Sequence, residues 1–224
     1  MTTLARIAIA VLMALFLSSC AFDMNFGEGK RGNGEVAKES REVYEEFTEI
    51  SAAEGLDVYV TQGDNFNIEV EADENIIELI GGRATKKIHV SLPSVTGLYA
   101  SSGADLYTQN VIRANKISLD ASSGAGIKVA LVADEVDADT SSGADIRIEG
   151  EAVLFYADAS SGSDIKAKDF AVRTCHADAS SGADISVNVS ETLIADASSG
   201  ADISYSGNPD VQKKKSYSGS VHKD

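Results

Sequence analysis

The sequence predicts an all-β protein built as a parallel, right-handed β-helix solenoid of about seven rungs, with a small non-repetitive N-terminal cap. A phrase of the type Ser-Ser-Gly-Ala-Asp recurs every 18 to 21 residues, and apolar and polar residues alternate around each copy in the same phase. A near-constant period is typical of a solenoid, in which each rung buries its inner face only against its neighbours.

Six glycines mark the repeat, and a degenerate copy at 218–220 follows them: Gly103, Gly124, Gly143, Gly162, Gly182 and Gly200. Counted from each glycine, the residues at offsets −3, −1, +1 and +3 are small or apolar, whereas the even offsets carry Asp, Ser or Gly. Alternation of period two is the signature of a strand. We therefore expect the whole phrase to be a strand with the odd offsets inward, including Ser142 and Ile146. The drift of the period excludes the strict multiple of six of a left-handed hexapeptide helix and favours the right-handed form.

The chain divides into four segments. Residues 1–19 have Arg6 before an apolar run and are expected to be a signal peptide. The run ends in Leu17-Ser18-Ser19-Cys20, which is similar to a bacterial lipobox and predicts cleavage before Cys20 and lipidation of that residue. Residues 20–41 are glycine-rich and charged and are expected to be a flexible tether. Residues 42–92 form the β-rich N-terminal cap, with a short helix over 73–80, and residues 93–224 form the repeats and a C-terminal cap.

Cys175 falls in the apolar column seven residues before the glycines, between Phe155 and Leu193 of the adjacent rungs. Free cysteine packs as a small hydrophobe, so we expect it in the core. A catalytic thiol paired with His176 is the alternative, but adjacent strand residues point to opposite faces.

Several stretches resemble the bacterial head GIN domain family. They are 55–63 (GLDVYVTQG), 187–189 (VNV), the repeated Ala-Ser-Ser-Gly-Ala-Asp and 205–209 (YSGNP). The resemblance extends over about residues 47–221. It implies a right-handed β-helix on a secreted or lipid-anchored adhesin-like protein of unknown biochemical function, and it carries over no catalytic residues.

Charge excludes some partners. The formal net charge is −16, and loss of Arg6 with the signal peptide makes it more negative. This argues against nucleic acid and against electrostatic docking on anionic lipid. The remaining partners are the membrane, through the N-terminal lipid, and a glycan or an envelope or cell-surface protein. We expect the protein in the bacterial cell envelope, lipid-anchored at the outer membrane.

The acidic residues are organised into two outward columns, which we expect on one face, bordering a strip of serines and glycines that runs between them. The column at −4 is Asp120, Asp139, Asp158, Asp178 and Asp196. The column at +2 is Asp105, Asp145, Asp164, Asp184 and Asp202, interrupted by Gly126. Solubility and edge protection are one interpretation of these columns, and cation or glycan binding is the other. Calcium is the cofactor they suggest, since it accepts carboxylate oxygens in flexible geometry.

No enzyme motif stands out: the histidines, His89, His176 and His222, are far apart in sequence and lack the spacing of metal ligands. Lys128, Arg147 and Lys166, at +4 beside the +2 column, keep a lyase-like, polysaccharide-active enzyme as an alternative. A passive envelope scaffold is a further one. The sequence favours an adhesion or binding module.

Overall fold

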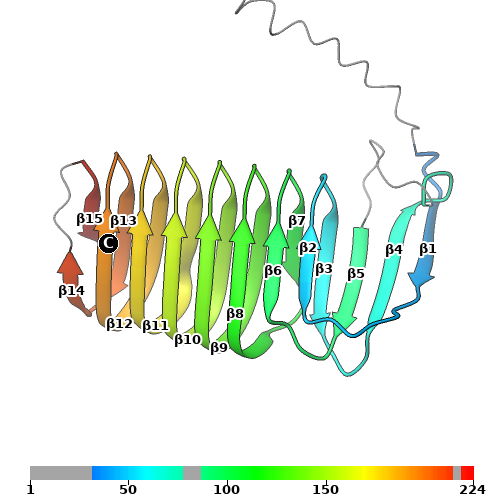
Figure 1. The fold of residues 1–224 in the computed structure, drawn as a ribbon, viewed down its shortest axis with the longest axis horizontal. Helices are drawn as coiled ribbons and strands as arrows, with labels where there is room; N and C mark the ends of the chain where they lie inside the picture. Colours follow the sequence, from blue (N-terminus) through cyan, green and yellow to red (C-terminus); the bar gives the residue numbers. More distant parts are fainter. Residues whose placement is uncertain (1–31, 78–86, 214–217) are drawn as a thin grey trace, which may run out of the picture. The chain divides into compact units, whose positions relative to one another are not determined.

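The computed structural model describes residues 32–77, 87–213 and 218–224, all within one compact unit, Arg31–Asp224. These residues form 15 β-strands joined in one sheet, and the described residues contain no helix. The repeats form a coil of parallel strands (Figure 1). The prediction of an all-β parallel solenoid is therefore confirmed.

Each long strand begins two residues after a turn glycine, bends around the base of the coil and ends just before the next turn. The strands of the repeat are β6 (Gly97–Ala100), β7 (Asp105–Thr108), β8 (Ile112–Ala121), β9 (Gly126–Thr140), β10 (Asp145–Ala159), β11 (Asp164–Ala179), β12 (Asp184–Ala197) and β13 (Asp202–Gly207). Neighbouring rungs pair in register, with Ile146 beside Ile165 and Ala159 beside Ala179. Like residues therefore stack in columns.

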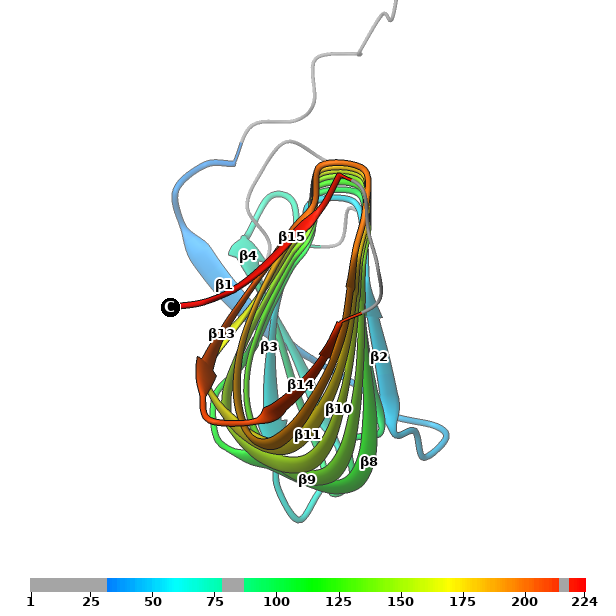
Figure 2. The same ribbon diagram turned by 90° about the vertical axis from the view of Figure 1, so that its left-hand side faces the viewer.

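Figure 2 views the coil from its C-terminal end. There the chain descends along β13, crosses the base and rises along β14 (Asp210–Lys213), so it winds counter-clockwise toward the viewer. This is a right-handed coil, the hand that almost all parallel crossover connections adopt. The cross-section is narrow at the turn and wide at the base.

The repeated phrase is a tight turn and not a continuous strand, which corrects one part of the sequence prediction. In all six copies the second serine has φ between 52° and 56° and the glycine has φ between 67° and 80°. In most copies an N–H to C=O bond closes the turn, as from Ala144 N to Ser141 O at 3.2 Å. Positive φ at both central residues defines a type I′ turn. Ser142 and its equivalents are therefore exposed at the apex, not inward as predicted.

The turns are also hydrogen-bonded to one another. Gly124 N–H donates to Ser142 O of the next rung at 3.2 Å, and Ser122 N–H donates to Ala100 O of the preceding rung at 3.0 Å. The ladder of the sheet thus continues over the apex. An added Cβ on the turn glycines would meet nothing within 4 Å, so glycine is required there by its backbone conformation and not by lack of space.

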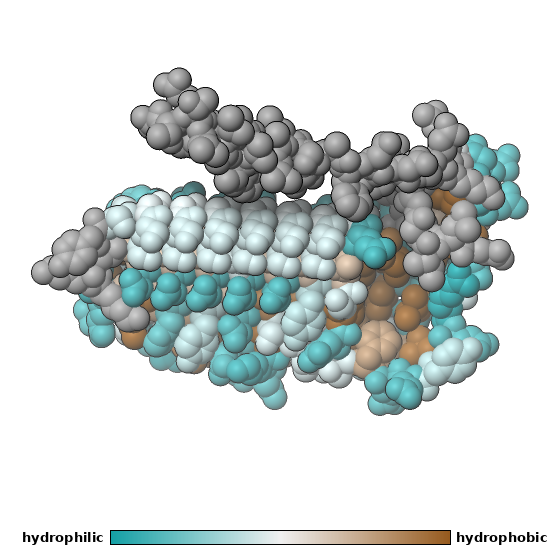
Figure 3. Space-filling view, turned by 45° about the horizontal axis from the view of Figure 1, so that its top comes forward, coloured by the Kyte–Doolittle hydropathy of each residue, from teal (hydrophilic) through white to brown (hydrophobic). Residues whose placement is uncertain are grey.

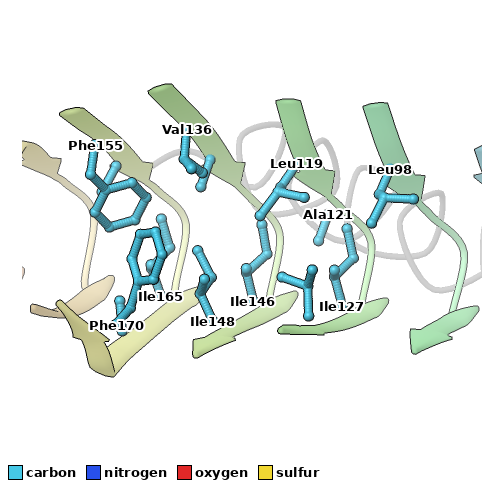
Figure 4. Close-up of a cluster of buried hydrophobic side chains, with 14 of the residues drawn as sticks. Leu98, Leu119, Ala121, Ile127, Val136, Ile146, Ile148, Phe155, Ile165 and Phe170 are labelled. Atoms are coloured by element: carbon cyan, nitrogen blue, oxygen red, sulfur yellow. The ribbon is translucent and has the colours of Figure 1, made fainter. Parts of the chain in front are cut away.

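The core side chains are small under the turn and larger toward the base of the coil. Under the turn the two walls meet through alanines such as Ala121, Ala159 and Ala179, all buried. At the wide base Phe155 and Phe170 fill the space edge to face, with ring centroids 5.3 Å apart. Figure 4 shows Leu98, Leu119, Val136 and Phe155 from one wall facing Ile127, Ile146, Ile148 and Ile165 from the other.

Cys175 lies in this core, paired in register with Phe155 and Leu193, as the sequence predicted. Burial raises the pKa of its thiol far above the ordinary range, so the nucleophilic thiolate is disfavoured. His176 points outward, where its ring contacts Tyr156.

The N-terminal region contains a repeat rung that the sequence analysis treated as part of the cap. β2 (Glu49–Ala52) and β3 (Asp57–Gln62) pair in parallel with β6 and β7. Glu54 and Gly55 join them with φ of 59° and 69°, the same turn as in the repeats. The solenoid therefore begins near residue 49, and only the segment between β3 and β6 is inserted.

That insertion covers the N-terminal end of the coil. β5 (Lys87–Leu92) pairs in parallel with β3. β4 (Asn67–Asp73) pairs antiparallel with β5, and β1 (Val36–Arg41) pairs antiparallel with β4. β1 lies within the predicted tether, so that prediction is wrong for residues 36–41. The helix expected over 73–80 is absent from its described part: Asp73 ends β4, residues 74–77 form turns, and 78–80 lie outside the described residues.

At the C-terminus the tail adds strands to the coil. β14 pairs in parallel with β12, and β15 (Ser220–Lys223) pairs with β13. The degenerate copy at 218–220 continues the stack of turns, since Gly200 N–H donates to Ser218 O. Lys213 Nζ donates to Val221 O at 2.5 Å, which places a charged side chain across this last edge, a common protection against edge pairing.

Candidate functional site

The ten predicted aspartates lie on two opposite faces of the coil, not on one strip. Those at −4 are on the strands that rise to the turn, here called the ascending face, and those at +2 are on the strands that leave it, the descending face. Figure 2 shows the two sets of strands diverging from the turn. In Figure 3 the turn edge is a pale band with a row of hydrophilic side chains beside it on the ascending face. The predicted single site is corrected to two surfaces because the phrase between the columns reverses the chain.

On the ascending face, Asp120, Asp139, Asp158, Asp178 and Asp196 occupy one register position in consecutive rungs. The last four of them line a hollow of about 570 Å³ together with Tyr156 and His176, whose ring centroids are 4.9 Å apart. Partial burial and then the neighbouring carboxylates raise the pKa values of Asp139 and Asp158 above their ordinary value. The fold therefore holds these charges together against their repulsion.

The columns do not form a chelating site. Equivalent side chains of successive rungs leave the sheet side by side, at the strand spacing of about 4.8 Å. Within residues 32–77, 87–213 and 218–224, no three or more His, Cys, Asp or Glu side chains are grouped so as to hold a metal ion. The calcium hypothesis has no geometric support in this part of the chain.

On the descending face the acidic column is longer than predicted. Asp145, Asp164, Asp184 and Asp202 are in register, and Asp105 continues the column beyond Gly126 to Asp57. Asp57 was missed, although it stands two residues after Gly55, as its equivalents do after the repeat glycines. Partial burial and then the charge of Asp57 raise the pKa of Asp105.

Beside this column runs a row of cations that the sequence identified as lyase-like. Lys128, Arg147 and Lys166 are adjacent in register. Lys166 Nζ lies 2.7 Å from Asp145 Oδ1 and 2.9 Å from Asp164 Oδ2, and these bonds raise its pKa. Lys128 and Arg147, by contrast, have no ion-pair partner within 4 Å among the described residues.

The same row continues toward the N-terminus as stacked aromatic rings. Tyr59 lies between His89 and Tyr107, with ring centroids 5.1 Å and 5.4 Å away. This stack was not identified from the sequence, because β3 was not recognised as the strand that pairs with both β5 and β7. The signal that the sequence offered for this stack is that Tyr59 and Tyr107 both occupy outward positions of the period-two pattern.

A further hollow, of about 830 Å³, runs along the base and was also missed. Arg113, Asp134, Glu151 and Arg173 are among its lining residues. Its nearly buried alanines, Ala133 and Ala152, lie where each rung bends and the period-two pattern breaks. Alternation alone does not predict a concave surface there.

Cys20, the predicted lipidation site, lies outside the described residues. Within the described part of the chain no helix is long and apolar enough to cross a membrane.

The fold and these faces define the protein as a β-solenoid that exposes straight, in-register rows of charged and aromatic side chains. The chain belongs to the family described as "Putative auto-transporter adhesin, head GIN domain", whose model matches residues 46–81 and 80–209. This confirms the resemblance noted in the sequence. The family is described as an adhesin domain and not as an enzyme. No curated protein matches the chain.

Solved structures share the fold. A putative adhesin from Bacteroides fragilis is 18% identical, covers 88% of this chain and 100% of its own, and has a TM-score of 0.78. A putative adhesin from Parabacteroides distasonis is 17% identical with a TM-score of 0.68, and covers 86% of this chain and 98% of its own. A putative lipid binding protein from the same organism is 18% identical, with the same coverage and a TM-score of 0.67.

Proposed function

We propose that the protein is a lipid-anchored adhesion module of the bacterial envelope, held at the outer membrane through Cys20 and binding a glycan or a cell-surface protein. The observation that carries the proposal is the descending face, where aromatic rings, carboxylates and two cations that have no ion-pair partner in the described part of the chain lie in register. Rigid surfaces that combine aromatic side chains with a few placed polar groups are typical of binding sites.

The charge of the chain supports an anchor that is covalent and not electrostatic. A formal net charge of −16 opposes direct binding to anionic lipid, so retention at a membrane depends on the lipid at Cys20. The family description supports adhesion as the purpose of that anchor.

The alternatives are a passive envelope scaffold and, with less support, a polysaccharide-active enzyme. A lyase needs a base poised to take a proton from the sugar. In the candidate row, Lys166 is held by two aspartates. Binding without turnover of polyuronates is therefore the expected behaviour.

Two measurements test the proposal. Membrane fractions of cells that express Cys20→Ala should lose the protein, or retain it unprocessed, whereas normal processing and retention would refute the anchor. The purified mature protein should bind one or more members of a panel of glycans and envelope fractions. Binding to none of them would favour the scaffold, and cleavage of polyuronates would favour the enzyme.

A further inference from the structure

The interruption of the descending acidic column at Gly126 creates a hollow. The hollow has a volume of about 290 Å³, and its lining includes Asp105, Tyr107, Lys128, Asp145 and Arg147. A Cβ placed on Gly126 would lie 2.4 Å from Asp105 Oδ1. The carboxylate of Asp105 therefore occupies the space that a side chain at this position would need, and it forms part of the floor of the hollow.

The charge of this hollow is opposite to that of the chain. Two acids, Asp105 and Asp145, face three cations, Lys128, Arg147 and Lys166. Lys166 is paired with Asp145 at 2.7 Å, whereas Lys128 and Arg147 have no ion-pair partner among the described residues. These two cations are neighbours in register and repel each other, so an anion between them would relieve that repulsion.

The hollow also has an aromatic boundary. Tyr107 is covered on one side by Tyr59, with ring centroids 5.4 Å apart. On its other side, the residue in register with Tyr107 is Lys128 of β9 and not another aromatic residue. The aromatic stack therefore ends at the hollow, where the ring of Tyr107 is available to the apolar C–H groups of a sugar ring.

We infer that the hollow over Gly126 binds a single carboxylate-bearing sugar residue of a glycan, such as a hexuronic acid. Arg147 and Lys128 hold the sugar carboxylate, Asp105 and Asp145 accept hydrogen bonds from its hydroxyls, and Tyr107 packs against the ring. This inference rests on the proposed function and names its ligand class.

Size and chemistry favour this ligand over others. The volume of about 290 Å³ lies just below the usual range of ligand pockets, about 300–1,000 Å³, which suits one sugar residue and not a buried oligosaccharide. Planar guanidinium groups pair with carboxylates through two parallel hydrogen bonds. A neutral sugar would leave both cations without a partner, and a cationic sugar would meet a net positive lining.

The test is titration of the mature protein with methyl glucuronide, methyl glucoside and glucose 6-phosphate at one ionic strength, followed by NMR. Methyl glucuronide should bind about tenfold or more tightly than methyl glucoside, and more tightly than glucose 6-phosphate. Arg147→Ala should weaken glucuronide binding about tenfold or more, because it removes a charge-assisted pair. Arg173→Ala removes the same charge from the base of the coil and should leave the affinity unchanged.

Gly126→Asp provides the second variant. It introduces the residue that other rungs carry at this position, so the fold should be kept, while the new side chain displaces the Asp105 carboxylate into the hollow and adds a negative charge. A melting curve checks the fold, and glucuronide binding should be lost.

Equal affinity for glucuronide and glucoside, tighter binding of the phosphate, or equal effects of Arg147→Ala and Arg173→Ala would each overturn the inference. If the wild-type protein binds none of the three sugars but still binds cells or envelope fractions, this site is refuted and the adhesion function stands. Loss of all binding in both assays would refute both.

Discussion

The pair of buried hydroxyls in the middle of the coil offers a quantitative test of how the rungs stack. Thr140 and Ser163 are buried at positions where most other rungs carry alanine. Ser163 Oγ lies 2.9 Å from Thr140 Oγ1 and 2.7 Å from Ser160 O. Without Ser163, the Thr140 hydroxyl keeps only a long contact of 3.5 Å to Asp158 O.

We expect Ser163→Ala to destabilise the protein by about 1–2 kcal/mol, because it leaves a buried hydroxyl nearly without a partner. Thr140→Val keeps the shape of the side chain and should cost about 1 kcal/mol. The double variant replaces both partners by apolar groups and should cost no more than the larger single change, which gives a coupling of about 1 kcal/mol.

Urea unfolding of the wild type, the two single variants and the double variant measures this cycle. In thermal unfolding, each kcal/mol should correspond to a shift in melting temperature of about 2–4 °C for a domain of this size. A double variant that costs the sum of the single variants would refute the reasoning. It would show that the two hydroxyls act independently and that the register of these rungs is not the one described.

Three further predictions follow from the core, the turn and the acidic columns. Ile165→Asp should abolish cooperative thermal unfolding by burying an unpaired charge, whereas Asp164→Asn should leave the melting temperature near that of the wild type. Similar melting temperatures for the two variants would show that the inward and outward positions are wrongly assigned. Gly143→Ala should lower the free energy of unfolding by about 1–2 kcal/mol because the φ of Gly143 is +71°. Ser142→Gly relieves the same backbone conformation and should leave the stability in urea unchanged or raise it. A stabilising Gly143→Ala and a destabilising Ser142→Gly would refute the assignment of the turn. Because burial and neighbouring carboxylates raise the pKa of Asp158 in the fold above the usual value of about 3.9, the folded state binds the proton more tightly and stability should rise as pH falls from 7 toward 4. Asp158→Asn should raise the melting temperature at pH 7 and flatten that dependence, and an unchanged pH profile would contradict it.

The repeat could be predicted because, in every rung, the alternation of apolar and polar residues matches the inward and outward faces of the coil. The spacing of the glycines predicted the coil, and residues such as Ile146, Ile165 and Cys175 were correctly assigned to the core. Ser142 was wrongly placed inward because its left-handed backbone conformation interrupts the strand. Alternation of apolar and polar residues does not distinguish a strand from a tight turn between two strands. The same turn placed the two aspartate columns on opposite faces.

The candidate site was less predictable because it depends on neighbours that are distant in sequence. Gly55 carries the same turn as the repeats, but the inserted strands β4 and β5 hide its period. Without that rung, the contacts of Asp57 with Asp105 and of Tyr59 with Tyr107 could not be inferred. The absence of a side chain at Gly126 was visible in the sequence, but the hollow that results required the paired rungs.

Adhesion to other cells requires the solenoid to be exposed at the cell surface, and labelling with a membrane-impermeant amine reagent measures this exposure. The side chains of Lys116 and Lys168 are 60% and 56% exposed and should react in the purified protein. Mass spectrometry then compares their labelling on intact cells with that on cells whose outer membrane has been permeabilised. Equal labelling in the two samples is the result expected for an adhesion module. Labelling only after permeabilisation would place the solenoid in the periplasm and contradict adhesion to other cells.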